Sequence, residues 1–397
     1  MQALEFFRSA TRYAAARAVG DRAPGLIAGP LAPLRLANLS EPEPPGPSWG
    51  RVAVRLSGIC GSDLATLSGN SSMYLSPLVS LPFVPGHEVV GELAQDVDDI
   101  PAGTRVVLDP VLSCSARGLE PCRACVSGAT NRCQRVTSGH VSPGLQTGYC
   151  ADTGGGWSGA LVAHRSQLHP VPDSLDDAAA VLVEPLACAV HAALRAEPDQ
   201  GDWVLVVGAG TLGALCLLAL RELTTAGRIT VVAKHPRQRD LALALGASEV
   251  VAPAGAARAI RRSAHAFMLT PERGDPFLTD GVDVALDCVG SEASLDLSLR
   301  TCRGRGRVVL VGLPSGEVDL TPVWYRELEV TGAYASGAGE LGGRSAFDIA
   351  VQLAGDPRLQ GLVDAVYPLA RWRDAVDHAL AAGRLGTIKV AFDPRIR

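Results

Sequence analysis

The sequence predicts an α/β protein in which a mostly-β stretch adjoins a doubly wound parallel sheet. From residue 1 to about 190, short apolar runs alternate with Gly and Pro clusters, a texture of strands and loops. From about 191 to 335, apolar strands alternate with helix-length segments, which is the pattern of a parallel sheet with helical crossovers. The chain has 397 residues, 47% hydrophobic and 19% charged, enough to build two cored domains.

Strands are expected in the first stretch at residues 51–56, 105–108 and 161–168. The segment 41–47 holds four prolines and is excluded from helix, because proline lacks an amide donor and restricts the residue before it.

Six strands of one parallel sheet are expected in the second stretch. Continuous apolar runs such as 204–207 are typical of strands that are buried on both faces. The expected strands are 202–207, 228–233, 249–252, 282–287, 307–311 and 329–334.

The last 60 or so residues contain two helical patterns and a strand at 388–392. This tail is too short to fold alone, so we expect it to pack on the first stretch. The predicted domains are therefore 1–188 with 336–397, and 189–335, with the active site in the cleft between them.

Charge and hydropathy exclude several classes of function. The chain has 36 Lys+Arg against 41 Asp+Glu, a net charge of -5, and no basic block, which argues against nucleic-acid binding. The chain has no run of about 18 apolar residues, so no membrane span is predicted. Arg8, Arg12 and Arg17 interrupt the apolar run that a secretion signal needs, so we expect a cytoplasmic protein.

A glycine-rich motif at 208–213 predicts a dinucleotide site. It follows an apolar strand and opens a helix expected at 214–223, the setting in which a helix N-terminus holds a pyrophosphate. The same pattern recurs at 337–342, but no strand–helix–strand unit follows, so that copy is interpreted as an ordinary loop.

The end of the second strand favours NADP(H) over NAD(H). Ala233 stands where an NAD site usually carries an acidic residue, and Lys234, His235, Arg237 and Arg239 follow. Cationic groups there can pair with a 2′-phosphate. The alternative is a solvated helix N-terminus with incidental basic residues.

Two groups of residues have the composition of zinc sites. Four of the ten cysteines, Cys114, Cys122, Cys125 and Cys133, suit a closed structural Zn²⁺ site, with an iron–sulfur cluster, disulfides or unrelated thiols as alternatives. Cys60, His87, Glu88 and Glu184 are spread along the chain and supply the ligand types of an open, catalytic zinc site.

In this order, the motifs resemble the zinc-dependent medium-chain dehydrogenase/reductase superfamily, and most nearly its polyol, glucose and threonine dehydrogenase branch. The motifs are Cys-Gly-Ser-Asp at 60–63, Gly-His-Glu at 86–88, the four-cysteine segment, Glu-Pro-Leu at 184–186 and the glycine motif.

The resemblance implies that residues 1–188 with 336–397 form a GroES-like catalytic domain and 189–335 a Rossmann domain, and it implies a role for each site residue. Cys60 and His87 would be zinc ligands, Glu184 a third ligand or a close carboxylate, and Glu88 a carboxylate that can enter or leave the zinc shell. Ser62 stands where the family has the hydroxyl that accepts the substrate's proton. The implied cofactor-binding residues are Gly208, Gly210, Thr211, Leu212, Gly213, Lys234, His235, Arg239, Val289 and Gly312. A homodimer or homotetramer is also implied.

The sequence departs from the family in several places. Ala65 replaces a relay histidine that these enzymes often carry, so the proton must leave through water or another group. Seven residues separate Cys114 from Cys122, where the family usually has two, and the extra residues could distort the lobe or weaken its metal. Segments 7–30 and 263–280 are interpreted as insertions. Each could be a lid, a partner surface or a neutral loop.

Three functions remain open at this point. The first is a zinc- and NADP(H)-dependent oxidoreductase of a secondary alcohol, polyol or ketone. The second is an NADPH-dependent reductase of an activated C=C or C=N bond without catalytic zinc, and the third is a non-catalytic NADP(H)-binding protein. His140 and Tyr149, after the four-cysteine segment, could line a substrate cleft or simply belong to a loop.

Overall fold

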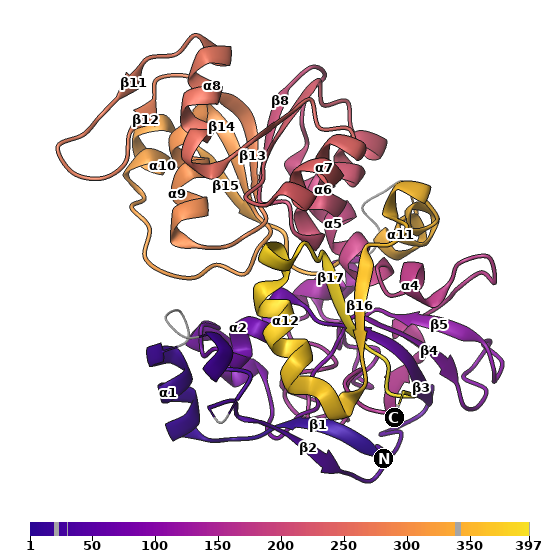
Figure 1. The fold of residues 1–397 in the computed structure, drawn as a ribbon. Coiled ribbons are helices and arrows are strands. Elements are labelled where there is room, and N and C mark those ends of the chain that lie inside the picture. Colours follow the sequence, from indigo (N-terminus) through magenta and orange to yellow (C-terminus); the bar gives the residue numbers. More distant parts are fainter. Residues whose placement is uncertain (20–23, 30, 338–342, 397) are drawn as a thin grey trace. The chain divides into compact units, whose positions relative to one another are not determined.

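The structure is a computed structural model, and it describes residues 1–19, 24–29, 31–337 and 343–396. The chain divides into two compact units, Met1–Ala187 with Ala335–Arg397 and Cys188–Tyr334 (Figure 1). The predicted α/β class is confirmed, because one unit is built on a mixed sheet and the other on a parallel sheet flanked by helices.

The first unit is built on a seven-stranded sheet. Its strand order is β16-β17-β3-β4-β5-β7, and β6 pairs with β3 off this path. The strands are β3 (Trp49–Gly58), β4 (Val89–Leu93), β5 (Arg105–Leu108), β6 (Ala160–His164), β7 (Leu168–Pro170), β16 (Val363–Tyr367) and β17 (Lys389–Phe392). Alternate side chains of these strands form one apolar core, and it includes Val52, Val54, Leu93 and Leu161.

A second core of this unit joins both ends of the chain. The antiparallel strands β1 (Gln2–Phe6) and β2 (Leu34–Asn38) contribute to it, and so does helix α12 (Trp372–Leu385), which lies along β17 (Figure 1). Ile27 and Ala28 are buried in the same core, so this part of segment 7–30 is structural rather than a neutral loop.

The remaining helices of this unit are short. They are α1 (Ala10–Val19), α2 (Gly61–Leu67), α3 (Arg123–Val126), α4 (Asp177–Ala180) and α11 (Ala346–Ala354). Helix α5 (Val183–Ala196) begins in this unit and runs into the other.

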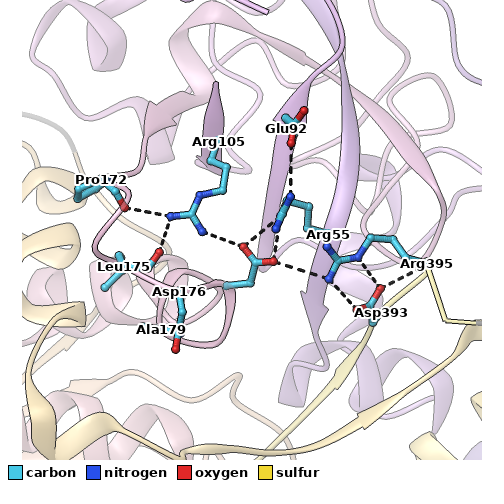
Figure 2. Close-up of polar contacts among 10 residues, drawn as sticks. Arg55, Glu92, Arg105, Pro172, Leu175, Asp176, Ala179, Asp393 and Arg395 are labelled. Carbon is cyan, nitrogen blue, oxygen red and sulfur yellow. Dashed lines mark hydrogen bonds and ion pairs between the residues drawn. The ribbon is translucent and has the colours of Figure 1, made fainter. Parts of the chain in front are cut away.

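An ionic network fixes α4 to the sheet (Figure 2). The Asp177 carboxylate accepts hydrogen bonds from Arg55 Nε at 2.9 Å and Arg105 Nη1 at 3.0 Å. Arg395 Nη2 lies 3.7 Å from the same carboxylate and pairs with Asp393 at 2.7 Å. Two strands, the C-terminal tail and the helix that leads towards Glu184 thus meet at one partly buried acid, Asp177.

The second unit is a six-stranded parallel sheet of order β10-β9-β8-β13-β14-β15. The strands are β8 (Trp203–Val207), β9 (Arg228–Val232), β10 (Glu249–Val251), β13 (Val282–Asp287), β14 (Cys302–Leu310) and β15 (Glu329–Gly332). The helices are α6 (Thr211–Leu223), α7 (Pro236–Ala244), α8 (Ala256–Ala264), α9 (Glu292–Thr301) and α10 (Thr321–Arg326). Segment 263–280 contains a small hairpin, β11 (Met268–Leu269) with β12 (Phe277–Leu278).

Several predicted boundaries were wrong. The strand expected at 161–168 is interrupted, because the His164 side chain accepts the Ser166 N–H and starts a 3-10 turn. Strand β14 begins at Cys302, five residues before its predicted start, and β16 was not predicted. The second glycine-rich motif lies mostly outside the described residues.

One stretch among the described residues, Asp177–Ala196, is long and apolar enough to cross a membrane by length and composition alone. Of its most apolar window 72% is buried in the protein, as in a core helix, so the stretch is weak support for a membrane span.

Candidate active site and metal centres

The four cysteines of the 114–133 segment lie together. Their sulfur atoms are all within 4.8 Å of one another, and Cys114 Sγ is 3.6 Å from Cys133 Sγ. Four thiolates around zinc, with Zn–S bonds of about 2.3 Å, place their sulfurs about 3.8 Å apart, so the donor set fits a tetrahedral ion. The four residues are free thiols, which sets aside disulfides among them.

Backbone amides point at these sulfurs. Cys122 N donates to Cys114 Sγ at 3.3 Å, and Gln134 N donates to Cys122 Sγ at 3.4 Å. The Gln134 hydrogen bond lowers the pKa of Cys122 to about 6, which favours the thiolate that binds metal.

The extra residues between Cys114 and Cys122 carry an anchor, Arg117, whose side chain is fully buried. Its guanidinium donates to five backbone carbonyls, those of Leu112, Ser138, Val141, Ser142 and Gly144. Arg117 thus ties the insertion to the loop that follows the last cysteine, and the longer spacing does not spread the four sulfurs.

Cys60 and His87 are positioned by one carboxylate. Cys60 precedes α2, and its N–H donates to Asp63 Oδ2 at 3.0 Å. The other Asp63 oxygen lies 3.5 Å from His87 Nδ1, and both side chains are buried. Burial lowers the pKa of His87, but Asp63 and Cys60 outweigh it and hold the pKa above its usual value. An acid on Nδ1 leaves Nε2 as the ring atom for a metal.

Glu88 is paired with a buried lysine. Its carboxylate contacts Lys389 Nζ, which also donates to the carbonyl of Ile59 at 3.2 Å. Burial lowers the pKa of Lys389, but Glu88, then Cys60 and Glu184, raise it above its ordinary value. A Cβ on Gly58 would come within 1.9 Å of Glu88 Oε2, so only glycine fits beside this ion pair.

Glu184 lies in the first turn of α5 and is 6% exposed. Its charge acts on Lys389 and on Asp109. Burial raises the pKa of Asp109 to about 7, and the nearby Glu184 adds to the effect.

The structure brings the predicted residues into one neighbourhood without closing a ligand shell. Within the ranges that the structure covers, only the four-cysteine group has three or more metal-ligating atoms within 4.8 Å of one another. Cys60 and His87 are adjacent, while Glu88 is turned to Lys389. A thiolate, an imidazole and a carboxylate nevertheless make up a donor set that zinc accepts.

Sequence reasoning did not identify Asp63 and Lys389 as parts of this site. It also left open whether Tyr149 lines a substrate cleft or simply belongs to a loop. The Tyr149 hydroxyl lies 3.5 Å from Asp63 Oδ1 and 3.4 Å from Thr66 Oγ1. Burial and the Asp63 charge raise the pKa of Tyr149, while hydrogen bonds from Thr66 and Ser62 oppose the shift. A signal existed only for Asp63, which belongs to the Cys-Gly-Ser-Asp motif.

The glycine motif of the second unit lies between β8 and α6, where it was expected. Gly208 has φ +96°, and a Cβ on Gly213 would lie 1.9 Å from Gly208 O, so both positions require glycine. A Cβ on Gly210 would meet no protein atom within 4 Å. That open side, at the N-terminus of α6 with Thr211 and Leu212, fits the close approach of a pyrophosphate.

Asp287 shapes the loops around this motif. Its Oδ1 accepts the N–H groups of Val289 at 3.0 Å and Gly290 at 3.1 Å, and its carbonyl accepts that of Gly312. The Val289 side chain is 51% exposed, and its Cγ2 would lie 2.4 Å from a Cβ on Gly208. An exposed apolar side chain beside the motif is suited to contact a cofactor.

The second strand, β9, ends at Val232, and Ala233 is buried after it. His235 is the N-cap of α7, and Lys234, Arg237 and Arg239 are exposed around its first turn. No acidic side chain lies between residues 233 and 239.

Comparisons with known proteins agree with this fold. The alcohol dehydrogenase GroES-like domain family matches residues 46–173, and the zinc-binding dehydrogenase family matches residues 212–354. L-idonate 5-dehydrogenase of Vitis vinifera is 30% identical over 296 residues, 73% of this chain and 74% of that protein. A sorbitol dehydrogenase of Halalkalibacterium halodurans is 27% identical, covering 89% of this chain and 94% of its own.

Among solved structures, a putative zinc-binding dehydrogenase of Sinorhizobium meliloti bound to NADP superposes with a TM-score of 0.70. It is 26% identical, and the match covers 91% of this chain and 96% of that one.

A GroES-like unit with a thiol–imidazole pair, joined to a parallel sheet with a dinucleotide motif, defines a nicotinamide-dependent oxidoreductase of the zinc type. The chain belongs to the zinc-type medium-chain alcohol dehydrogenase family, which confirms the resemblance that the motifs carried.

Proposed function

We propose that this protein transfers a hydride between NADP(H) and a secondary alcohol or polyol, or the corresponding ketone. Cys60, His87 and Glu184 would hold the catalytic zinc, with Glu88 as an exchangeable fourth group. The observation that carries the proposal is the placement of Cys60 and His87 against one Asp63 carboxylate. Residues 1–188 with 336–397 would form the catalytic domain, and 189–335 would bind the dinucleotide.

The side chains around the site have distinct tasks in this reaction. When bound, zinc would polarise the substrate oxygen and the nicotinamide would carry the hydride. Asp63 keeps the His87 ring in one orientation. Lys389 keeps Glu88 in an ion pair, from which the carboxylate could move to the zinc. Ser62, the second residue of α2, takes the proton of the substrate hydroxyl.

The relatives support a polyol as the substrate. They include an L-idonate 5-dehydrogenase, sorbitol dehydrogenases and an L-galactonate-5-dehydrogenase. These names share a secondary alcohol on a polyhydroxylated carbon chain, so we propose the same class for this chain.

The basic residues after β9 support NADP(H). Lys234, His235 and Arg239 follow a buried Ala233, so no acidic side chain there would repel a 2′-phosphate. The Sinorhizobium relative that binds NADP points the same way.

Metal content per chain tests the zinc proposal. Protein purified without chelator should contain two zinc ions, and Cys60→Ala should contain one. Cys302→Ala, which removes a buried thiol from the other unit, should still contain two. The wild type should oxidise sorbitol or L-idonate, and Cys60→Ala should not.

One zinc in both wild type and Cys60→Ala would contradict the catalytic site. It would favour the second candidate, an NADPH-dependent reductase of an activated C=C or C=N bond. The observation behind that candidate is the pairing of Glu88 with Lys389. Among the described residues, Cys60 and His87 belong to no group of three ligand atoms that all lie within 4.8 Å of one another.

Cofactor choice is tested by the double variant Lys234→Ala/Arg239→Ala. It should lower kcat/KM for NADP⁺ by about tenfold or more, because charge-assisted contacts to a phosphate are lost, and leave the value for NAD⁺ almost unchanged. Arg262→Ala, which removes a cation from α8, is the matched control. Equal effects on both cofactors would contradict NADP(H) preference.

We also propose a homodimer or homotetramer. Strand β15 ends the strand order of its sheet, and Val330 on it is 40% exposed, which suits pairing with a second copy. Light scattering after size exclusion should show twice or four times the mass of 41.2 kDa.

A further inference from the structure

We propose that the hydroxyl groups of Ser62, Tyr149, Thr66 and Ser71 form a proton relay that replaces the histidine missing at Ala65. The inference rests on the proposed function, since it concerns the proton that the substrate hydroxyl gives up.

Helix α2 arranges two of the four hydroxyls. Ser62 and Thr66 are four residues apart, so they lie one turn above each other on the same face. Ala65 also lies on this helix, but its methyl group carries no proton. Any exit along α2 must therefore use the face that holds Ser62 and Thr66.

Tyr149 joins the two. Its hydroxyl lies 3.4 Å from Thr66 Oγ1, and the Ser62 side chain is close enough to the same phenol to lower its pKa. Thr66 Oγ1 is in turn 3.0 Å from Ser71 Oγ. Each link is a hydroxyl that can accept one proton and give up another.

Tight packing surrounds the middle of the relay. The space lined by Phe6, Asp63, Thr66, Phe83 and Tyr149, among others, has no room for a water molecule. Tyr149 is 8% exposed, whereas Ser62, Thr66 and Ser71 are only partly buried. The relay therefore passes through one buried hydroxyl, that of Tyr149, and ends at Ser71, which reaches solvent.

Segment 7–30 supports the outer end of the relay. Tyr13 on α1 donates its hydroxyl to the Ser71 carbonyl at 3.3 Å. A Cβ on Gly69, which has φ +70°, would come within 3.1 Å of the Tyr13 carbonyl, so α1 packs directly on this turn. The insertion thus holds Ser71 beside Thr66.

The proton balance is complete without a charged intermediate. As the substrate O–H and C–H bonds break, the hydride would leave with NADP⁺, the hydroxyl proton passes to Ser62, and the Ser62 proton passes to Tyr149. The phenol proton moves to Thr66, the Thr66 proton to Ser71, and the Ser71 proton to bulk water. In the resting structure Thr66 Oγ1 donates to the Ser62 carbonyl at 2.9 Å, and the Tyr149 hydroxyl donates to Asp63 Oδ1 at 3.5 Å. The Thr66 hydrogen must therefore rotate towards Ser71, and the Tyr149 hydrogen towards Thr66.

The test compares variants that remove a hydroxyl and keep the shape. Tyr149→Phe keeps the ring contacts with Phe83 and His87, and Thr66→Val is isosteric with Thr66. Each should lower kcat for oxidation of sorbitol or L-idonate at pH 7 by about tenfold or more, the scale of positioned proton transfer. The loss should shrink at higher pH, where hydroxide takes the proton.

Three readouts separate the relay from packing. Thr66→Ser, which keeps the hydroxyl, should retain the wild-type rate and pH profile. The dependence of the rate on the D₂O fraction should be curved in the wild type, where several protons move, and linear in Tyr149→Phe. Ala65→His in the Tyr149→Phe background should restore part of the rate. Zinc content and NADPH binding, followed by fluorescence, should be unchanged in all variants.

Wild-type rates and pH profiles in both Tyr149→Phe and Thr66→Val would overturn the relay. So would equal losses in Thr66→Ser and Thr66→Val, since packing alone would then explain them. A wild-type protein that binds two zinc ions and oxidises neither sorbitol nor L-idonate would overturn the proposed function, and the relay with it.

Discussion

His169 is a partly buried imidazole that the proposed reaction does not use. Its ring stacks on Phe347, with ring centroids 4.5 Å apart, and connects β7 to α11. Burial lowers the pKa of His169 to about 4, although Asp348 nearby acts in the opposite direction. The neutral ring is therefore the form that the fold accepts.

The lowered pKa makes stability depend on pH. Between about pH 6.5 and pH 4 the unfolded chain binds a proton at this residue and the folded chain does not, so stability falls as the pH falls through that range. We expect His169→Phe to reduce the loss between pH 7 and pH 5 by about 1–2 kcal/mol. Urea unfolding at the two pH values measures this, and His140→Phe, at an exposed loop position, is the control. Parallel losses in wild type and His169→Phe would contradict it.

Single residues of the site were predictable from sequence only where a short motif carried them. Cys60, His87 and Glu184 each belong to such a motif. Lys389 was not predicted as a site residue. Its contact with the carbonyl of Ile59 joins residues 330 positions apart, and no local pattern in the sequence indicates such a contact. The position of Tyr149 in the site could not be predicted, because it depends on how the loop after the four-cysteine lobe folds back against α2.

At the scale of elements, helix α4 is stabilised by ion pairs more than by the helix propensity of its residues. It has four residues, too few for helix propensity to stabilise it. The Asp176 side chain caps it by accepting the Ala179 N–H at 2.7 Å, while Asp177 binds it to Arg55, Arg105 and Arg395 (Figure 2).

These two neighbouring acids should differ in their contribution to stability. Asp177→Asn leaves three guanidinium groups without their shared carboxylate, and we expect it to lower the free energy of unfolding by about 2–4 kcal/mol. Asp176→Ala removes one cap and should cost about 1 kcal/mol. Urea unfolding gives both values, and an equal effect of the two changes would show that the network contributes nothing beyond the helix end.

Strands were predictable where apolar runs alternate with helical segments, as they do throughout the second unit. The expected 282–287 is observed as β13, whose side chains are mostly buried, and the edge strands β10 and β15 were also expected although neither has a buried residue. Strand β16 at the end of the first sheet has no buried residue either and lies outside that alternating pattern, so nothing distinguished it from a loop. Helix α6 begins three residues before its predicted start, because Gly210 rather than Gly213 precedes its first turn.

At the scale of the whole molecule, Arg117 should decide how firmly the four-cysteine lobe holds its metal. Arg117→Leu would leave five carbonyls of the lobe without their shared donor, and we expect a loss of about 3 kcal/mol or more in stability. Zinc should then pass to a coloured chelator at least tenfold faster than from wild type.

Arg132→Ala, at an exposed position of the same lobe, should release zinc at the wild-type rate. Limited proteolysis should cut Arg117→Leu within residues 115–144, while the sheet of the first unit stays intact. Unchanged zinc release in Arg117→Leu would show that the four thiolates alone hold the lobe together.

The insertion that carries Arg117 bears on how metal-binding segments change over time. A lobe can lengthen between two ligands without losing its ion when the added residues bring a contact of their own into the interior. The number of residues between two ligands then records how a loop is anchored, rather than which metal it holds. Searches for such lobes in other sequences should therefore accept long gaps that contain a single arginine, which a fixed ligand spacing would discard.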